Sequence, residues 1–382
     1  MTPPRGRVVQ PPRPRVTVLG AGSWGTTFAK VLADGGSDVT LWARRPELAK
    51  EIREAKRNSD YLPGVNLPVA VTATSDVAAA LEHAQFVFVS VPSQTLRGNL
   101  ADIRSLLPAD APVTSLMKGV EKGTGARMSE VLESVLEIDP ARIAVASGPN
   151  LALEIAKEQP TAAVVSSTSL ETAESVARVA TNRYFRSFVN TDVIGTEFGG
   201  VLKNLIAVAI GIVDGVGYGE NTKASIITRG LVEMTDFAVA YGGHPETLSG
   251  LAGLGDLIAT SGSSLSRNNT AGRLLGQGYS FADVVKSMQQ TAEGLASVAP
   301  VLALAQAKGV DMPICRQVSQ VLAGTLDPKD IAPHLTTDDD SAPQGERTPD
   351  ARKDHGGGAL RRSFERALDQ LRHRGRGSRG DR

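Results

Sequence analysis

Short apolar runs alternate with helical patterns through the first half of the chain. The runs are RVTVL, DVTLW, QFVFVS, APVTSL, RIAVAS and TAAVVSS, and all lie between residues 15 and 167. Brief β-branched runs of this kind are typical of strands buried inside a parallel sheet, whose two faces the intervening helices cover. The pattern predicts an α/β fold that is Rossmann-like, with a mostly parallel, doubly wound sheet.

The second half of the chain loses this alternation. From about Thr191 to Pro333 apolar positions recur at helical spacing, with interruptions at GYGEN, YGGHPE and GLAGLGD. We therefore expect an α/β domain at residues 15–190 and an all-α domain at residues 191–335. The sequence shows no internal repeat of fixed period.

Both ends of the chain differ from the middle in composition. Residues 1–14 are rich in Pro and Arg, and residues 336–382 are strongly polar. Neither segment carries enough apolar residues for a packed core, so both are expected to be disordered. One stretch near the C-terminus is compatible with a short amphipathic helix, because its apolar residues recur at helical spacing. These residues are Leu360, Phe364, Leu368 and Leu371.

Bulk composition narrows the class of partner. The chain has 41 Lys and Arg against 41 Asp and Glu, which gives no electrostatic reason to expect a nucleic acid or a membrane surface. No apolar run approaches the roughly 18 residues that span a bilayer, and the first residues lack the apolar core of a signal peptide. The single cysteine, Cys315, excludes a cysteine-rich metal site and suits a small buried apolar role. We expect a cytoplasmic protein with a small-molecule substrate, no membrane insertion and no metal.

The stretch VTVLGAGSWGTTFAKVLADGG joins a predicted strand to a predicted helix. Gly20, Gly22 and Gly25 have G-x-G-x-x-G spacing between the strand at residues 16–19 and the helix, and a second strand follows at residues 39–42. Such glycines permit a tight turn and close approach to a pyrophosphate, while the helix N-terminus presents N–H groups to the phosphates. The first domain is therefore predicted to bind a dinucleotide.

The residues after the second strand bear on the choice of dinucleotide. Proteins that bind NAD usually have an acidic residue there for the ribose 2′-hydroxyl, whereas this chain has Arg44 and Arg45, with Glu47 close by. Guanidinium groups would attract a 2′-phosphate, so NADP(H) is the preferred cofactor and NAD(H) is usable. An exposed turn is the alternative explanation for the two arginines.

Polar residues and glycines follow several other strands, at the sheet edge where ligands bind in open α/β folds. They include Lys118 in LMKGVEKGTG, and Gly148 and Asn150 in SGPNLALE. In the helical half, Lys203 and Asn204 interrupt an apolar helix at GGVLKNLIAV. A lysine there must pair, reach solvent or lose its charge, and without further context reaching solvent is the commoner case.

The stretch GLAGLGDLIATSGSSLSRNNTAGR brings together further polar side chains. They are Asp256, Thr260, Ser266, Arg267 and Asn268. A serine-rich segment before a basic residue is compatible with a phosphate site and also with a flexible linker.

In order along the chain, these motifs resemble the soluble, bacterial-type NAD(P)-dependent glycerol-3-phosphate dehydrogenases. The matching stretches are LGAGSWGTTFA, LMKGVEKGTG, GVLKNLIAVAIGIVDGVGYGENTKASIITRG and GLAGLGDLIAT, between about Arg15 and Pro333. The resemblance implies reversible reduction of dihydroxyacetone phosphate to sn-glycerol 3-phosphate, which supplies glycerophospholipid synthesis. We also expect a homodimer.

The resemblance implies roles for individual residues. Lys203 would be the general acid and base, with a pKa lowered by its apolar surroundings and by a second cation at Lys118. The implied substrate-binding residues are Lys118, Gly148, Asn150, Lys203, Asp256, Ser266, Arg267 and Asn268. The cofactor-binding residues predicted from the motifs and the resemblance are Gly20, Gly22, Ser23, Trp24, Gly25, Arg44, Arg45, Lys118, Ala152, Arg267, Thr291 and Glu293.

Two other functions are compatible with the same features. One is a dehydrogenase of similar plan that acts on a β-hydroxyacid or an imine, and the other is a non-catalytic redox sensor that binds NADPH. Loss of Lys203 would abolish turnover by a dehydrogenase, whereas it would leave ligand binding by a sensor intact.

Overall fold

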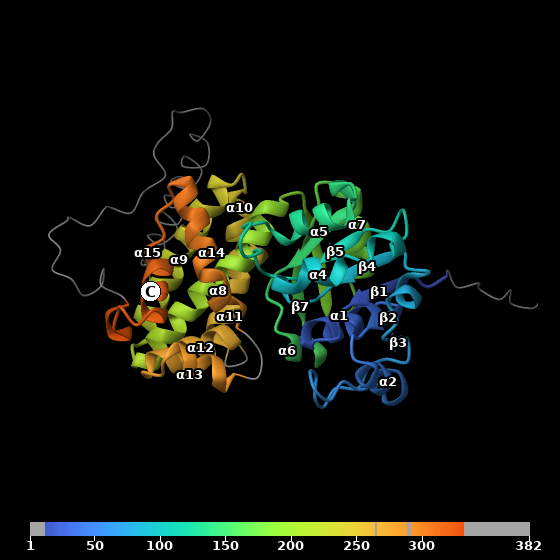
Figure 1. Cartoon of the computed structure of the whole chain (residues 1–382), viewed down its shortest axis with the longest axis horizontal. Helices are drawn as coiled ribbons and strands as arrows, with labels where there is room; N and C mark the ends of the chain where they lie inside the picture. The colour runs from blue at the N-terminus through green and yellow to red at the C-terminus, as the bar shows by residue number, and fades with distance from the viewer. Residues whose placement is uncertain (1–11, 264–265, 289–291, 332–382) are drawn as a thin grey trace, which may run out of the picture. The chain divides into compact units, whose positions relative to one another are not determined.

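The computed structural model describes residues 12–263, 266–288 and 292–331, all within one compact unit (Figure 1). The boundary predicted near residue 190 stays a prediction, and we use it only to name a sheet half (residues 12–190) and a helical half (residues 191–331). The predicted amphipathic helix and most of the two predicted disordered ends lie outside the described residues. Just before the first strand, the Pro14 carbonyl accepts a hydrogen bond from the Asp38 N–H at 2.9 Å, so the chain is already tied to the sheet there.

The sheet half contains one eight-stranded sheet. Its strands are β1 (Arg15–Leu19), β2 (Asp38–Trp42), β3 (Val71–Thr74), β4 (Phe86–Val89), β5 (Val113–Ser115), β6 (Ile143–Ser147), β7 (Thr161–Ser166) and β8 (Phe185–Asn190). Their order is β3-β2-β1-β4-β5-β6-β7-β8, and every neighbouring pair is parallel except β6 with β7. The chain reverses its direction of travel between β1 and β4, and this is the point where open α/β sheets bind ligands. The predicted mostly parallel sheet is confirmed, and β3 and β8 are strands that the prediction missed.

Helices cover both faces of this sheet, as predicted. They are α1 (Ser23–Asp34), α2 (Pro46–Ala55), α3 (Val77–Leu81), α4 (Leu96–Leu100), α5 (Met128–Leu136), α6 (Ala152–Ala156) and α7 (Leu170–Val179), with 3₁₀ turns η1 (Ser93–Thr95), η2 (Arg104–Leu106) and η3 (Pro140–Arg142). On β4, Phe88 packs against Phe28 of α1, with 5.1 Å between ring centroids. Its neighbours Val87 and Val89 instead join a second apolar cluster with Leu132 of α5. Alternate residues of a strand point to opposite faces, so the sheet is buried on both sides.

The helical half is built around one long helix, α8 (Val193–Val216), which confirms the predicted all-α character. The other elements are α9 (Glu220–Ala240), α10 (Pro245–Ser249), a π-helical turn η4 (Leu251–Gly255), α11 (Asp256–Gly262), α12 (Arg267–Gly276), α13 (Phe281–Ser287), α14 (Glu293–Lys308), α15 (Pro313–Leu322) and a 3₁₀ turn η5 (Pro328–Asp330). The stretch GLAGLGD, predicted as an interruption, is the π-helical turn that runs directly into α11. Cys315 on α15 is fully buried in the helical core, as its predicted apolar role requires.

Helix α12 packs unusually close to α8 because glycines line the contact. A Cβ on Gly272 would lie 2.1 Å from the carbonyl oxygen of Val208, and one on Gly211 would lie 2.2 Å from that of Asn269. No larger residue fits at either position without moving a backbone. This contact places the start of α12, and with it Arg267 and Asn268, next to the middle of α8.

Helix α8 is also long and apolar enough to cross a membrane by length and composition, which the sequence analysis did not anticipate. However, 83% of its apolar window is buried inside the protein. A helix that is apolar on nearly all sides and enclosed by other helices is a core helix of a soluble fold.

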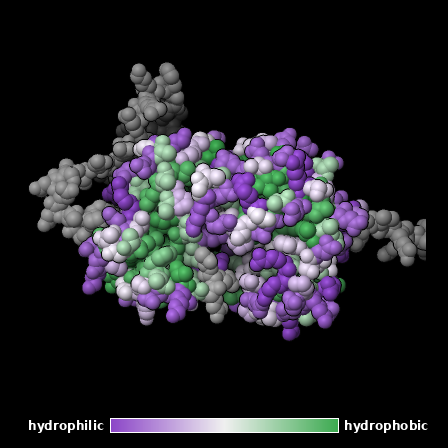
Figure 2. Space-filling model, viewed as in Figure 1, coloured by the Kyte–Doolittle hydropathy of each residue, from purple (hydrophilic) through white to green (hydrophobic). Residues whose placement is uncertain are grey.

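An apolar strip lies on the surface of the helical half. Figure 2 shows hydrophobic residues gathered over the position of α14. Phe281 and Val285 on the neighbouring α13 are 42% and 53% exposed, which is high for side chains of this kind.

Candidate active site

Lys118, Lys203 and Asp256 come together from three separate elements. Lys118 lies in the loop after β5, Lys203 near the middle of α8, and Asp256 at the first position of α11. The Asp256 carboxylate accepts from Lys118 Nζ at 2.5 Å through Oδ2, and its Oδ1 lies 3.1 Å from Lys203 Nζ. Lys203 Nζ also donates to Thr260 Oγ1 at 2.6 Å. The lysine that interrupts the apolar helix is therefore paired inside the protein and does not extend to solvent.

Burial and neighbouring charges set the protonation of this cluster. Lys203 is only 7% exposed, and burial, with help from the nearby Lys118 ammonium, lowers its pKa from 10.5 to about 8 against the opposing attraction of Asp256. For Asp256, burial acts to raise the pKa, but the two ammonium groups outweigh it and hold the pKa below the usual value. The cluster thus contains a fixed carboxylate and an amine that exchanges its proton close to neutral pH.

A glycine one turn before Lys203 allows the loop and α8 to approach. A Cβ on Gly200 would lie 2.9 Å from Ser147 Oγ and 3.2 Å from Lys118 Cγ. Gly148 has a φ of +129° and a Cβ there would lie 3.1 Å from Ala163 Cα, while its carbonyl accepts from Lys118 Nζ at 3.1 Å. Both glycines therefore serve the placement of Lys118.

Two buried polar side chains beside this cluster have no partner within the described structure. The Asn150 side-chain oxygen and nitrogen and the Ser147 hydroxyl are buried without a hydrogen bond. Buried polar groups are nearly always paired, so orphaned ones next to a charged cluster suit a site that a polar ligand completes. This suits the predicted role of Asn150, which stays a prediction, and Ser147 is a neighbouring residue that the sequence analysis did not select.

Three of the predicted substrate-binding residues, Ser266, Arg267 and Asn268, lie at the start of α12, where two are buried and one is exposed. Ser266 caps α12, because its Oγ accepts from the Asn269 N–H at 3.2 Å. Asn268 bridges helices, since its Nδ2 donates to Asn204 Oδ1 at 2.8 Å and its Oδ1 accepts from the Gly294 N–H at 3.0 Å. The Ser266 hydroxyl can still donate its own proton, and Asn268 Nδ2 carries a second N–H, so both can also bond a phosphate. Of the three, Arg267 is the exposed one, at the first position of α12.

Glu293 lies within electrostatic reach of all three cations of the region. Burial raises the pKa of its carboxyl, and the charges of Arg267, Lys118 and Lys203 act in the opposite direction. It is the first residue of α14, where a carboxylate favours the helix N-terminus. The structure therefore brings Glu293 to the same site, whereas the predicted Thr291 lies outside the described residues.

The glycine-rich turn has the shape that a dinucleotide needs. A Cβ on Gly20, which has a φ of +116°, would lie 2.2 Å from the Ser90 carbonyl oxygen, and one on Gly25 would lie 1.9 Å from that of Gly20. At Gly22 an added Cβ would meet nothing within 4 Å, so this glycine leaves open space at the N-terminus of α1. Among the described residues no side chain caps that helix end, whose first N–H groups suit a pyrophosphate.

The other predicted cofactor residues surround this turn. Ser23 Oγ donates to the Tyr61 carbonyl at 2.6 Å, and Trp24 packs edge-on against Phe28 at 5.4 Å between ring centroids. Ala152 begins α6 and its carbonyl accepts from Thr27 Oγ1 at 3.3 Å, which ties α6 to α1. These residues are close to the turn, and their contacts with a cofactor stay a prediction.

The two arginines after β2 differ in their surroundings. Arg45 Nη2 lies 2.5 Å from Asp60 Oδ2, and its guanidinium lies 5.8 Å from the centre of the Tyr61 ring. Arg44 is exposed and has no ion-pair partner in the part of the chain that the structure describes. Arg44 is therefore the more available of the two for a 2′-phosphate.

Sequence reasoning noticed Thr260 but did not place it among the site residues. It stands four residues after Asp256 on α11 and donates to Asp256 Oδ1 at 3.1 Å while accepting from Lys203. The spacing of four residues, which puts two side chains on one face of a helix, is the signal that identifies it.

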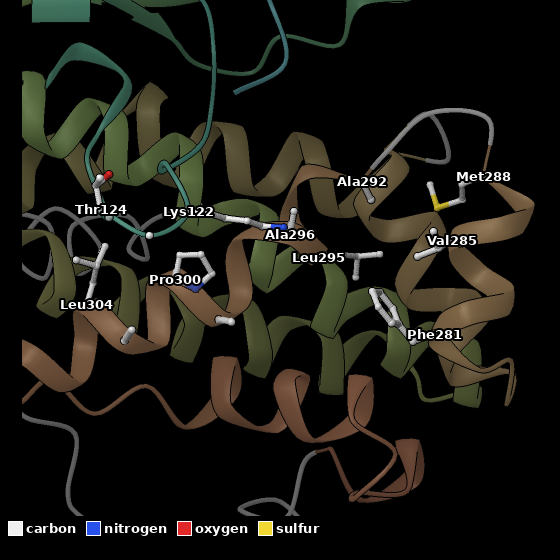
Figure 3. Close-up of a pocket in the computed structure, with 14 residues that line it drawn as sticks. Lys122, Thr124, Phe281, Val285, Met288, Ala292, Leu295, Ala296, Pro300 and Leu304 are labelled. Carbon is white, nitrogen blue, oxygen red and sulfur yellow. The ribbon is translucent and has the colours of Figure 1, made fainter. Parts of the chain in front are cut away.

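A separate groove of about 760 Å³ contains none of the predicted residues. As Figure 3 shows, Phe281, Val285 and Met288 line one end, while Leu295 and Pro300 lie along α14. Its lining is almost entirely apolar, apart from the loop at residues 122–125. This groove lacks the convergent charged groups of the cluster around Lys203.

Comparisons with known proteins identify the family of the chain. Residues 15–173 match the model of the N-terminus of NAD-dependent glycerol-3-phosphate dehydrogenase, and residues 192–333 match that of its C-terminus. The chain is similar to a glycerol-3-phosphate dehydrogenase [NAD(P)+] of Leifsonia xyli subsp. xyli, with 74% identity over 96% of this chain and 100% of the relative. It is 53% identical to one from Frankia casuarinae, over 84% of this chain and 96% of the relative. Among solved structures, glycerol-3-phosphate dehydrogenase from Coxiella burnetii has a TM-score of 0.80 and 36% identity, covering 85% of this chain and 99% of that one.

Proposed function

The chain belongs to the NAD-dependent glycerol-3-phosphate dehydrogenase family, and from this premise we propose that it reversibly reduces dihydroxyacetone phosphate to sn-glycerol 3-phosphate with Lys203 as general acid and base. As a member of the family it is an oxidoreductase that uses NAD(P). The observation that carries the proposal is the buried Lys203, paired with Asp256 and poised to exchange its proton near pH 8.

Lys203 has the chemistry that the reaction requires. When bound, the reduced nicotinamide supplies a hydride to the substrate carbonyl carbon, and negative charge develops on the carbonyl oxygen. The Lys203 ammonium delivers a proton to that oxygen, and in the reverse direction the neutral amine recovers it. Asp256 and Thr260 accept hydrogen bonds from Lys203 Nζ and hold it in one direction. A pKa of about 8 makes both protonation states accessible near neutral pH.

The neighbouring residues support binding and orientation of an anionic substrate. The Lys118 ammonium adds positive charge beside Lys203, and the unpaired Asn150 amide suits a substrate hydroxyl or carbonyl. Arg267, the exposed residue at the start of α12, would hold the phosphate, because a guanidinium pairs with phosphate in a bidentate manner. Binding energy from the phosphate would then orient the carbonyl toward Lys203.

The residues of the glycine-rich turn fit a dinucleotide. Gly22 provides open space at the α1 N-terminus, where a pyrophosphate would accept from backbone N–H groups. Arg44 would hold a 2′-phosphate, which supports NADP(H) as the preferred cofactor, with NAD(H) usable.

A direct assay tests this function. NADPH oxidation should be fast with dihydroxyacetone phosphate and slow with a panel of keto acids and imines. Because reduction needs protonated Lys203, kcat for reduction should fall as pH rises through about 8, and kcat for oxidation of sn-glycerol 3-phosphate should rise there. Preference for a keto acid or an imine would favour the rival dehydrogenase, and binding of NADPH without any turnover would favour the sensor.

We also propose the use of the product, the cellular compartment and the assembly of the enzyme. Its product is the backbone of glycerophospholipids, so the enzyme would supply their synthesis from the cytoplasm. A homodimer is the assembly we propose, and the groove along α14 with the exposed Phe281 and Val285 supports it as a surface that a second copy could cover. Light scattering of the unmodified chain and of Val285→Asp would test this, and a monomer at all concentrations would contradict it.

A further inference from the structure

Glu197 is a buried carboxylate on α8 that the proposed mechanism does not use. It is 5% exposed and lies six residues before Lys203. Its Oε1 accepts from the Ser129 N–H at 2.9 Å, and its Oε2 accepts from Ser129 Oγ at 2.5 Å and from Arg127 Nη1 at 2.7 Å. The carboxylate of one helix in the helical half thus caps the start of α5 in the sheet half.

The buried ion pair between Glu197 and Arg127 fixes the relative position of the two elements that it joins. Burial raises the pKa of Glu197, while Arg127 and the Ser129 groups act to lower it. A buried ion pair of this kind is often no more stabilising than apolar packing of similar volume, but it accepts only one geometry. Its value to the protein is therefore expected to lie in the position that it fixes.

The segment that Glu197 holds begins at Lys118. From Lys118 the chain passes Val120, which is fully buried in the apolar core of the helical half, and reaches Arg127 and Ser129 at the start of α5. The segment is thus anchored to the helical half at three points. Lys118 bonds Asp256 at its beginning, Val120 packs in the middle, and Glu197 holds its end.

We infer that Glu197 is a positioning residue, whose bonds to Arg127 and Ser129 keep the Lys118 segment against α8 and so keep the Lys118 ammonium beside Asp256 and Lys203. This inference rests on the proposed function. Within the described structure, the charged groups that act most strongly on Lys203 are Asp256 on α11, Lys118 on this segment and Glu293 on α14. Of these Lys118 is the positive one, so its withdrawal would leave two attractive charges and make the Lys203 proton harder to remove.

The test compares Glu197→Gln with a matched control, Glu130→Gln. Glu130 bonds the same Arg127 and the same helix start, at 2.8 Å to both its backbone N–H and its Nη2, but it is half-exposed and, within the described residues, forms no hydrogen bond or ion pair with α8. Glu197→Gln should lower kcat by about ten- to a hundredfold, as expected for a loosened catalytic geometry, and move the midpoint of the kcat pH profile above that of the unmodified enzyme. Glu130→Gln should leave both unchanged.

A second readout does not depend on turnover. Acetic anhydride labelling at a series of pH values, followed by mass spectrometry of the peptide with Lys203, reports the midpoint of that amine directly. This midpoint should rise in Glu197→Gln and stay unchanged in Glu130→Gln. If it moves although no dihydroxyacetone phosphate is reduced, the positioning role holds and the proposed function fails.

Equal midpoints and equal kcat in the two variants would overturn the inference, even with an active unmodified enzyme. Should Glu197→Gln fail to fold, Ser129→Ala decides the matter, because it removes one of the three bonds and keeps the backbone N–H. It should shift the Lys203 midpoint in the same direction by a smaller amount, and an unshifted midpoint would overturn the inference.

Discussion

Replacing Lys203 with Met should remove turnover while leaving the fold intact or more stable. Methionine keeps a similar length and an apolar stem but can neither donate a proton nor carry charge. A missing general acid typically costs ~10²–10⁴-fold in rate, and the stabilisation of the developing alkoxide is lost with it. NADPH should still bind, because the glycine-rich turn lies in the sheet half.

The magnitude for stability follows from the pKa of Lys203. A fall from 10.5 to about 8 means that the fold disfavours the charged amine by about 3 kcal/mol, at ~1.4 kcal/mol for each pH unit. Because the folded pKa is the lower one, this destabilisation is fully present below pH 8. It is relieved between about pH 8 and 10.5, where the unfolded chain binds more protons than the folded one. The free energy of unfolding of Lys203→Met at pH 7 should therefore equal that of the unmodified chain or exceed it by up to about 3 kcal/mol. The difference between the two should shrink toward pH 10.

The assay measures turnover, NADPH affinity and urea unfolding in the same preparation. Lys50→Met is the matched control, because it makes the same exchange at an exposed position of α2 and should change none of the three. If Lys203→Met kept more than roughly a tenth of kcat, the proton would have to come from elsewhere, with Lys118 the next candidate. If the free energy of unfolding of Lys203→Met at pH 7 were lower than that of the unmodified chain by more than about 2 kcal/mol, the argument from burial would be refuted.

Three further predictions concern other parts of the chain. Replacing Arg44 and Arg45 with Ala should erode the preference for NADPH over NADH in kcat/KM by about tenfold or more, mostly through Arg44 because Asp60 holds Arg45; equal efficiency of the unmodified enzyme with both cofactors would contradict this. Arg267→Ala should raise KM for dihydroxyacetone phosphate and lower kcat, and the assignment is wrong if the unmodified enzyme reduces unphosphorylated dihydroxyacetone equally well. A chain that ends at Thr336 should keep its turnover, since the polar residues beyond it lie outside the two matched family models, the second of which ends at residue 333, and a folded but inactive truncation would disprove the idea.

The sequence pattern identified the inner strands and missed the outer two for a physical reason. Strands β3 and β8 are the two edges of the sheet. In the edge strand β8, FRSFVN, the polar residues Arg186 and Ser187 interrupt the apolar ones, and Phe188 is 47% exposed. Edge strands face solvent on more sides, so they lack the continuous apolar run by which the inner strands were found.

The residues of the site could be chosen from the sequence, but their individual tasks could not. The resemblance to the family pointed to Lys118, Lys203 and Asp256, and the fold brings both lysines within hydrogen-bonding distance of Asp256. Pairing between distant positions is not visible in a motif. Asn268 forms a bridge with Asn204, 64 residues earlier, and the tie from Glu197 to Ser129 spans 68 residues.

The three glycines of the turn after β1 are required for different reasons. Gly20 and Gly25 are fixed by the protein itself, because a methyl group at either would collide with a backbone carbonyl. Gly22 borders empty space, so the folded chain alone gives no reason to exclude alanine there. In a library of single substitutions scored once for soluble protein and once for activity, Gly20 and Gly25 would be intolerant in both screens, whereas Gly22 would be intolerant only in the second. The difference between the two scores would mark where the dinucleotide, and not the polypeptide, selects the residue.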